Sequence, residues 1–167
     1  MNFSDSRTWR NLRTAYDGEL RASGKYRLYA EKAADDQLAH IERVFEETAD
    51  NEQEHAELWL ERLNGGTLPA TDENLRDAAA GEFSEWTDRY RRFAQEAREE
   101  GFHDLAREFE RVAAVERHHN QRFCALNDGL TNGSAFGGTE EAVWICLNCG
   151  HIHYGRSAPR ECPLCGK

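Results

Sequence analysis

The feature that most constrains the fold of this chain is a pair of ionisable motifs lying inside apolar helical stripes. Glu52 and His55 form one Glu-x-x-His pair, and Glu116 and His119 form a second pair later in the chain. Positions three and four apart share one face of an α-helix, so each pair faces the same way as its apolar neighbours. The first stripe contains Ile41, Phe45, Thr48, Trp59 and Leu63, and the second contains Leu105, Phe109, Val112, Phe123 and Leu126. A carboxylate facing a core must be paired or bound to a metal, because burying an isolated charge is costly.

The apolar periodicity predicts four long helices, at residues 8–34, 38–63, 73–101 and 104–126. Glycines at Gly65, Gly66 and Gly101 are typical helix ends. The first and third helices carry further glutamates on or beside their stripes, namely Glu19, Glu82 and Glu85. Four helices of this length are typical of an all-α four-helix bundle.

Counting from the turns places the ionisable groups at one height. Glu19 precedes the turn at Asp36 by almost the same number of positions as Glu52 follows it, so an antiparallel hairpin brings them level. The glutamates before Gly101 and the Glu-x-x-His pair after it are matched around that turn in the same way. The repeated spacing indicates an internal duplication. The predicted layer contains seven groups: Glu19, Glu52, His55, Glu82, Glu85, Glu116 and His119.

This layer matches a known metal-ligand pattern. Di-iron and di-manganese carboxylate bundles use one Glu from each of two helices and Glu-x-x-His from the other two. Carboxylates can bridge two cations, and each imidazole can complete the coordination of one metal. Any single glutamate could instead be a surface ion-pair residue, as we expect for Glu54 and Glu61. The shared height of all seven favours metal binding.

The composition excludes several functions. A net charge of −10 and a pI near 5.2 argue against nucleic acid as a partner, since phosphate backbones select basic surfaces. No apolar run approaches the roughly 20 residues of a membrane span, and the N-terminus lacks the apolar core of a secretory signal. We therefore expect a cytoplasmic protein with no membrane partner.

Four cysteines near the C-terminus form a second candidate site. Cys146-x-x-Cys149 and Cys162-x-x-Cys165 are two pairs in one short segment, a spacing that predicts a four-thiolate metal site rather than a disulfide framework. Zinc would make a structural ribbon and iron a one-electron carrier; the spacing leaves both open. A glycine-rich segment before it predicts a flexible linker. We therefore expect a bundle at residues 1–128, a linker at 129–140 and a small metal-stapled domain at 141–167.

Several longer motifs carry a resemblance to a known family. They lie at residues 11–26, 45–55 (FEETADNEQEH), 80–87 (AGEFSEWT), 115–119 (VERHH) and 144–150 (WICLNCG). Over nearly its whole length the chain resembles rubrerythrin. The resemblance implies a ferritin-like bundle with two non-haem iron ions, which reduces hydrogen peroxide to water in oxidative-stress defence. It also implies that residues 141–167 form a rubredoxin-like β/loop domain, whose iron at Cys146, Cys149, Cys162 and Cys165 relays the electrons.

The resemblance further implies individual roles. Glu52 and Glu116 would bridge the two irons. Glu19 and Glu85 would bind one iron, with His55 replacing Glu85 on reduction, and Glu82 and His119 would bind the other. Tyr26 and Tyr90 match family tyrosines near the site. The implied partners are hydrogen peroxide, an unidentified electron-donor protein or reductase, and a second subunit in a homodimer whose tails serve each other's bundles.

Two points leave alternatives open. The bundle could belong to a ferritin-type protein that oxidises and stores iron, with the tail as a structural zinc ribbon. Family members also continue past the last cysteine with a segment carrying aromatic residues, whereas this chain stops at Lys167. Either the sequence is truncated or the module shields its iron less well.

Overall fold

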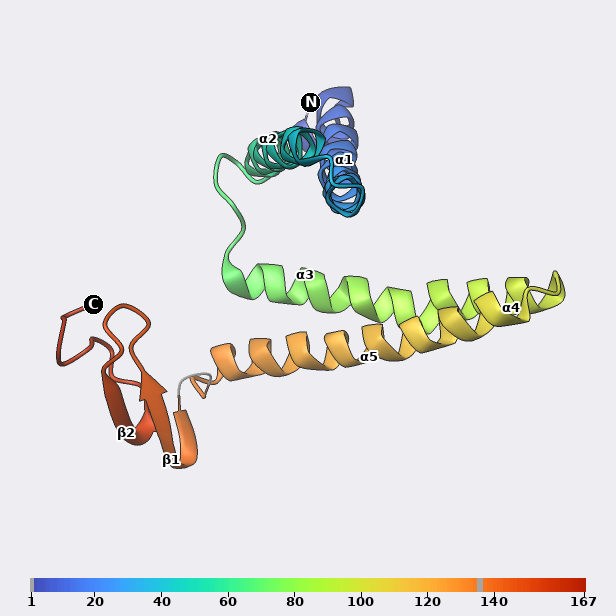
Figure 1. Cartoon of the computed structure of the whole chain (residues 1–167). Coiled ribbons are helices and arrows are strands. Elements are labelled where there is room, and N and C mark those ends of the chain that lie inside the picture. Colours follow the sequence, from blue (N-terminus) through green and yellow to red (C-terminus); the bar gives the residue numbers. More distant parts are fainter. Residues whose placement is uncertain (1, 135–136) are drawn as a thin grey trace. The chain divides into compact units, whose positions relative to one another are not determined.

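The chain forms two units, Met1–Pro69 and Ala70–Lys167. The computed structural model describes residues 2–134 and 137–167 (Figure 1). It is mostly helical and ends in a two-stranded segment that carries four cysteines, as the periodicity and the Cys spacing predict. Among the described residues, no helix combines the length and apolarity needed to cross a membrane.

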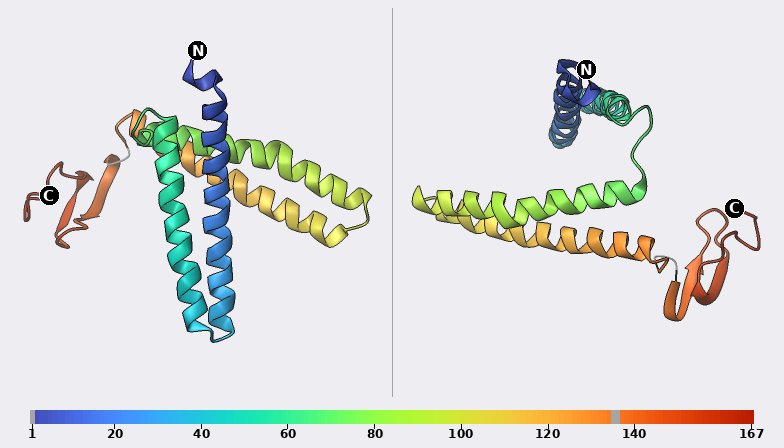
Figure 2. Two further views of the ribbon diagram at one scale, coloured as in Figure 1. Left: turned by 90° about the horizontal axis from the view of Figure 1, so that it is seen from above. Right: turned by 180° about the vertical axis from the view of Figure 1, so that it is seen from behind.

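The first unit is an antiparallel helical hairpin. A short 3-10 turn, Phe3–Asp5, precedes α1 (Arg7–Asp35), and α2 (Ala39–Leu63) runs back beside it (Figures 1 and 2). These bounds confirm the first two predicted helices. The buried positions are small, which lets the two backbones approach closely: Ser23, Ala30, Ala33, Ala49 and Ala56.

The helical part of the second unit is also a hairpin, but one of its arms is not a plain α-helix. α3 (Thr71–Ser84) continues through a π-helical turn, Glu85–Arg89, into α4 (Tyr90–Glu99), and α5 (His103–Thr131) runs back along it (Figure 2). The sequence predicted one uninterrupted α-helix here. The π turn is marked by the Tyr90 N–H, which donates to the Glu85 carbonyl five residues earlier.

The π turn changes which residues share a face. An α-helix turns about 100° per residue, so Ala94, twelve positions after Glu82, would point about 120° away from it in a plain α-helix. Absorbing one extra residue reduces that angle to about 20°. Ala94 and Ala97 are buried, and their burial depends on this correction.

α5 extends five residues beyond the predicted end at Leu126. Gly129 is accommodated inside the helix, and the first glycine in the left-handed region after it is Gly133, with φ of 76°. The Thr131 hydroxyl donates to the Asn127 carbonyl at 2.8 Å within the last turn. The helix therefore enters the segment predicted as a linker, of which residues 135–136 lie outside the described part of the chain.

The tail is a β-hairpin with two cysteine loops. β1 (Gly137–Ile145) pairs antiparallel with β2 (Ile152–Ser157), with Trp144 opposite His153. The Trp144 Nε1–H donates to the Gly155 carbonyl at 2.8 Å, which ties the indole to the opposite strand. One Cys-x-x-Cys loop follows β1 and the other follows β2.

Candidate metal sites

The first hairpin brings Glu19, Glu52 and His55 together. One ligand atom from each of the three lies within 4.8 Å of the others. His55 Nδ1 is 2.9 Å from Glu52 Oε2. One turn away, the Ser23 hydroxyl donates to the Ala49 carbonyl at 2.8 Å and holds the two helices at this level. The predicted register of the first hairpin is thereby confirmed.

The second hairpin repeats this arrangement with Glu82, Glu116 and His119. Their ligand atoms also lie within 4.8 Å of one another. His119 Nδ1 is 2.8 Å from Glu116 Oε2 and 3.8 Å from Glu82 Oε1. The Asn120 side-chain amide donates to the Ala79 carbonyl at 2.8 Å and links α5 to α3 beside the triad. The two triads have the same residue types in the same helical positions, as a duplicated site requires.

The carboxylates of these triads differ from the surface carboxylates of the same helices. The Glu116 side chain is 15% exposed, whereas Glu47, which pairs with Arg43, is 67% exposed. Burial and the neighbouring Glu116 carboxylate raise the pKa of Glu82. Crowded, partly desolvated carboxylates beside an imidazole are a donor set that a divalent or trivalent cation would neutralise.

Glu85 belongs to neither triad. It lies in the π turn, and its carboxylate pairs with Arg89 one turn later. Tyr90 follows the turn, and burial together with the Glu85 and Glu116 carboxylates raises the pKa of its hydroxyl. Tyr26 lies in the first hairpin, where its ring stacks on Phe45 with centroids 6.1 Å apart. The structure thus places six of the seven predicted ligands in two triads, one in each hairpin, and the seven-residue layer stays a prediction.

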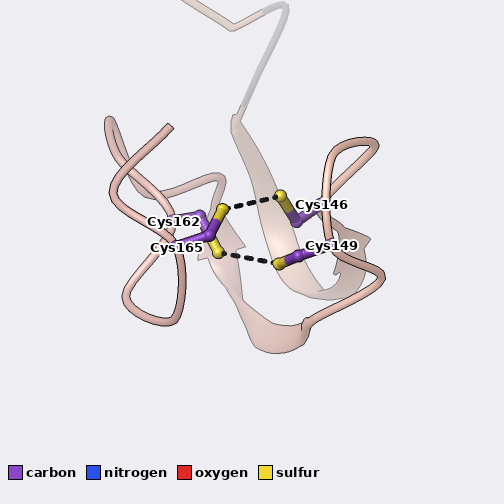
Figure 3. Close-up of side chains that lie close together, drawn as sticks. All are labelled: Cys146, Cys149, Cys162 and Cys165. Carbon is purple, nitrogen blue, oxygen red and sulfur yellow. Dashed lines mark hydrogen bonds between the residues drawn. The ribbon is translucent and has the colours of Figure 1, made fainter.

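The tail gathers its four cysteines into a cage (Figure 3). All four are free, with Sγ–Sγ distances of 3.8 Å for Cys146 and Cys165 and 3.6 Å for Cys149 and Cys162. A tetrahedral ion with metal–thiolate bonds of about 2.3 Å requires sulfurs about 3.8 Å apart. The cage therefore has the dimensions of a tetrathiolate metal site.

Hydrogen-bond donors surround the sulfurs. The backbone N–H groups of Cys149 and Asn148 lower the pKa of Cys146 to about 6. The Lys167 N–H and the Asn148 side-chain amide, whose Nδ2 lies 3.5 Å from Cys165 Sγ, lower the pKa of Cys165. The His151 N–H acts in the same direction on Cys149, but partial desolvation and the three other thiols raise its pKa to about 12. Once thiolates have formed, these N–H groups stabilise the negative charge on sulfur.

Family models match almost the whole chain. The model described as "Rubrerythrin" matches residues 10–69 and 73–144, and "Rubrerythrin, rubredoxin-like domain" matches residues 144–167. The chain belongs to the rubrerythrin family. The rubrerythrin of Porphyromonas gingivalis is 43% identical over 96% of this chain and 86% of its own length. That of Nitratidesulfovibrio vulgaris is 39% identical over 96% and 90%. A solved structure of nigerythrin in a mixed-valence state aligns at 30% identity over 98% of this chain and 86% of its own, with a TM-score of 0.38.

Family membership confirms the ferritin-like fold class and a place among oxidoreductases of oxidative-stress defence. Iron fits both donor sets of this rubrerythrin-family chain: carboxylate and imidazole groups in the hairpins, and four thiolates in the tail. The π turn is the feature of the site that sequence reasoning missed. Its signal was the spacing of Glu82, Glu85 and Tyr90, which share a face only if one residue is absorbed between them.

Proposed function

We propose that this chain is a non-haem di-iron peroxidase that reduces hydrogen peroxide to water with electrons relayed through iron at the four cysteines. The observation that carries the proposal is the pair of equivalent Glu/Glu/His triads in a chain that also holds a thiolate cage of tetrahedral dimensions. Two metals near each other suit a two-electron reaction, and a tetrathiolate iron suits one-electron supply.

In this proposal, all seven residues of the predicted layer bind the two irons. Glu52 and Glu116 would hold both irons, Glu19 and Glu85 would hold one of them, and Glu82 and His119 would hold the other. His55 would take the place of Glu85 as a ligand when the irons are reduced. Two side chains have room for that exchange: the His55 side chain is 55% exposed, against 20% for Glu52, and Glu85 is held by the flexible side chain of Arg89.

The reaction H2O2 + 2e⁻ + 2H⁺ → 2H2O balances if two ferrous ions supply one electron each. Among the chain's own groups, Tyr90 would hold a proton beside the site, because burial and the neighbouring carboxylates raise the pKa of its hydroxyl and keep it protonated as a hydrogen-bond donor. The neighbouring carboxylates would balance the positive charge of the two irons.

We propose the bundle at residues 1–128, the linker at 129–140 and the rubredoxin-like domain at 141–167, operating as a homodimer in the cytoplasm. The N–H groups around Cys146 and Cys165 would stabilise the extra negative charge of the reduced tail iron. Its electrons would come from an electron-donor protein or reductase.

The proposal is tested by anaerobic titration of fully reduced protein with hydrogen peroxide. Oxidation of two ferrous ions per peroxide, counted over the bundle and the tail together, with no dioxygen released, is expected. A ferritin-type protein would instead take up ferrous iron in air well beyond two ions per chain and would hold zinc in its tail. Either of those results would contradict the peroxidase.

A further inference from the structure

The connection between the two hairpins is short, and both of its ends are fixed. α2 ends at Leu63 and α3 begins at Thr71. After α2, the Gly66 N–H donates back to the Glu61 carbonyl at 2.7 Å, with Gly65 and Gly66 in the left-handed region at φ of 79° and 105°. Before α3, the Ala70 N–H donates to Glu73 Oε2 at 3.2 Å. The chain therefore has four residue steps, from Gly66 to Ala70, in which to travel.

A ferritin-like bundle formed by one chain needs a longer connection than this. That fold has one crossover, in which the second and third helices run parallel and the chain between them returns along the bundle. Glu52 lies about three helical turns before the end of α2, and Glu82 lies about three turns after the start of α3. If both glutamates lie in one layer, a crossover must span about 33 Å, plus the roughly 8–10 Å between neighbouring helix axes. Four extended steps reach about 14 Å, and all eight from Leu63 to Thr71 reach about 29 Å.

We infer that each di-iron bundle is built from two copies of this chain, the first hairpin of one packing on the second hairpin of the other. The inference rests on the proposed seven-ligand site. Each copy then contributes to two bundles: Glu19, Glu52 and His55 to one, and Glu82, Glu85, Glu116 and His119 to the other. The connection runs between the bundles and does not have to cross either one.

The helix faces that carry the ligands also expose apolar side chains, which a second hairpin would bury. Ile41 shares its stripe with Glu52 and is 45% exposed. Leu105 and Leu126 share the stripe of Glu116 and are 48% and 52% exposed. The surface that fits each face is that of the other hairpin, because only this pairing completes the ligand set. Since the connection is too short for a crossover within one chain, that hairpin must come from a second copy. A short connection between two packed units favours this kind of exchange.

Two heterodimers test the inference directly. The first pairs a chain carrying Glu52→Ala and His55→Ala with a chain carrying Glu116→Ala and His119→Ala. The second pairs wild-type chain with a chain carrying all four substitutions. Different affinity tags on the two chains allow purification of the heterodimer alone. Bundle iron is measured relative to tail iron, which these substitutions leave in place.

The exchanged arrangement predicts opposite results for the two heterodimers. The first contains one bundle with no substitution and should bind half as much bundle iron as wild type, whereas the second contains only damaged bundles and should bind almost none. If each chain formed its own bundle, the first would bind almost none and the second half. Three outcomes would overturn the inference: that result, bundle iron in neither heterodimer, or failure to recover heterodimers. A wild-type dimer that binds no bundle iron would instead refute the proposed site itself.

Lengthening the connection supplies a second test with every ligand present. An insert of about a dozen Gly and Ser residues after Gly66 adds about 40 Å of reach, enough for a crossover within one chain. In this background, the first heterodimer should lose its bundle iron, because each chain can close its own damaged bundle. Unchanged iron would show that connection length does not decide the pairing.

Discussion

The Ser23 hydroxyl lies 2.8 Å from the carbonyl oxygen of Ala49 and joins α1 to α2 one turn from Glu19 and Glu52. Ser23 is 3% exposed and Ala49 is fully buried, so the helices touch here with no room for a larger side chain. This contact sets the height at which the first triad forms.

Ser23→Leu should separate the helices at this level. Overpacking a filled contact typically costs about 1–3 kcal/mol, and loss of the hydrogen bond adds about 1 kcal/mol. We expect reduced stability in urea unfolding and less bundle iron per tail iron. Thr14→Leu, at an exposed position of the same helix, is the matched control. Equal iron content in both variants would show that the Ser23 contact does not position the triad.

The π turn should tolerate loss of one residue better than the α-helices do. Deleting Thr87 converts the turn into plain α-helix and leaves the faces of α3 and α4 aligned, so we expect a loss of less than about 1 kcal/mol. Deleting Arg111 rotates one end of α5 against the other by about 100° and should cost more than about 3 kcal/mol, as buried positions become exposed. Urea unfolding monitored by helical circular dichroism compares them. Similar losses would mean that the turn absorbs no extra residue.

Metal affinity of the tail should increase with pH. At neutral pH the Cys146 thiol, with a pKa of about 6, is already mostly ionised, whereas Cys149, with a pKa of about 12, is protonated. Metal binding must release at least the Cys149 proton, so the affinity should fall at least about tenfold for each unit of decreasing pH, and more steeply below about pH 6, where Cys146 also takes up a proton. Chelator competition across this range measures the slope. A pH-independent affinity would contradict the assignment.

Asn148 should tune the tail iron. Replacing it with Leu removes the amide that donates to Cys165 Sγ and leaves the reduced, more negative site less stabilised. If the bond contributes about 1 kcal/mol more in the reduced state, the reduction potential should fall by about 40 mV. Ser157→Ala, at an exposed position of β2, should leave the potential unchanged in the same redox titration. An unaltered potential in the Asn148 variant would exclude this role.

Much of this fold could be predicted because apolar periodicity and turn glycines act locally. The bounds of α1 and α2 and the level of Glu19 with Glu52 follow from counting residues along regular helices. The π turn could not be predicted this way, since the counting assumes a constant helical turn. The end of α5 was also missed, because a glycine ends a helix only where its backbone turns into the left-handed region, and Gly129 stays helical. How one hairpin meets another depends on chain reach and copy number, which periodicity does not encode.

The electron relay is tested most directly by rapid mixing of fully reduced protein with hydrogen peroxide while the tail iron is followed by its ferric tetrathiolate absorption. The tail iron of the wild-type chain should reoxidise much faster than that of a Glu52→Ala variant with an equally loaded tail, because the bundle draws the tail's electrons only when its site is intact. Equal rates in the two proteins would contradict the electron relay.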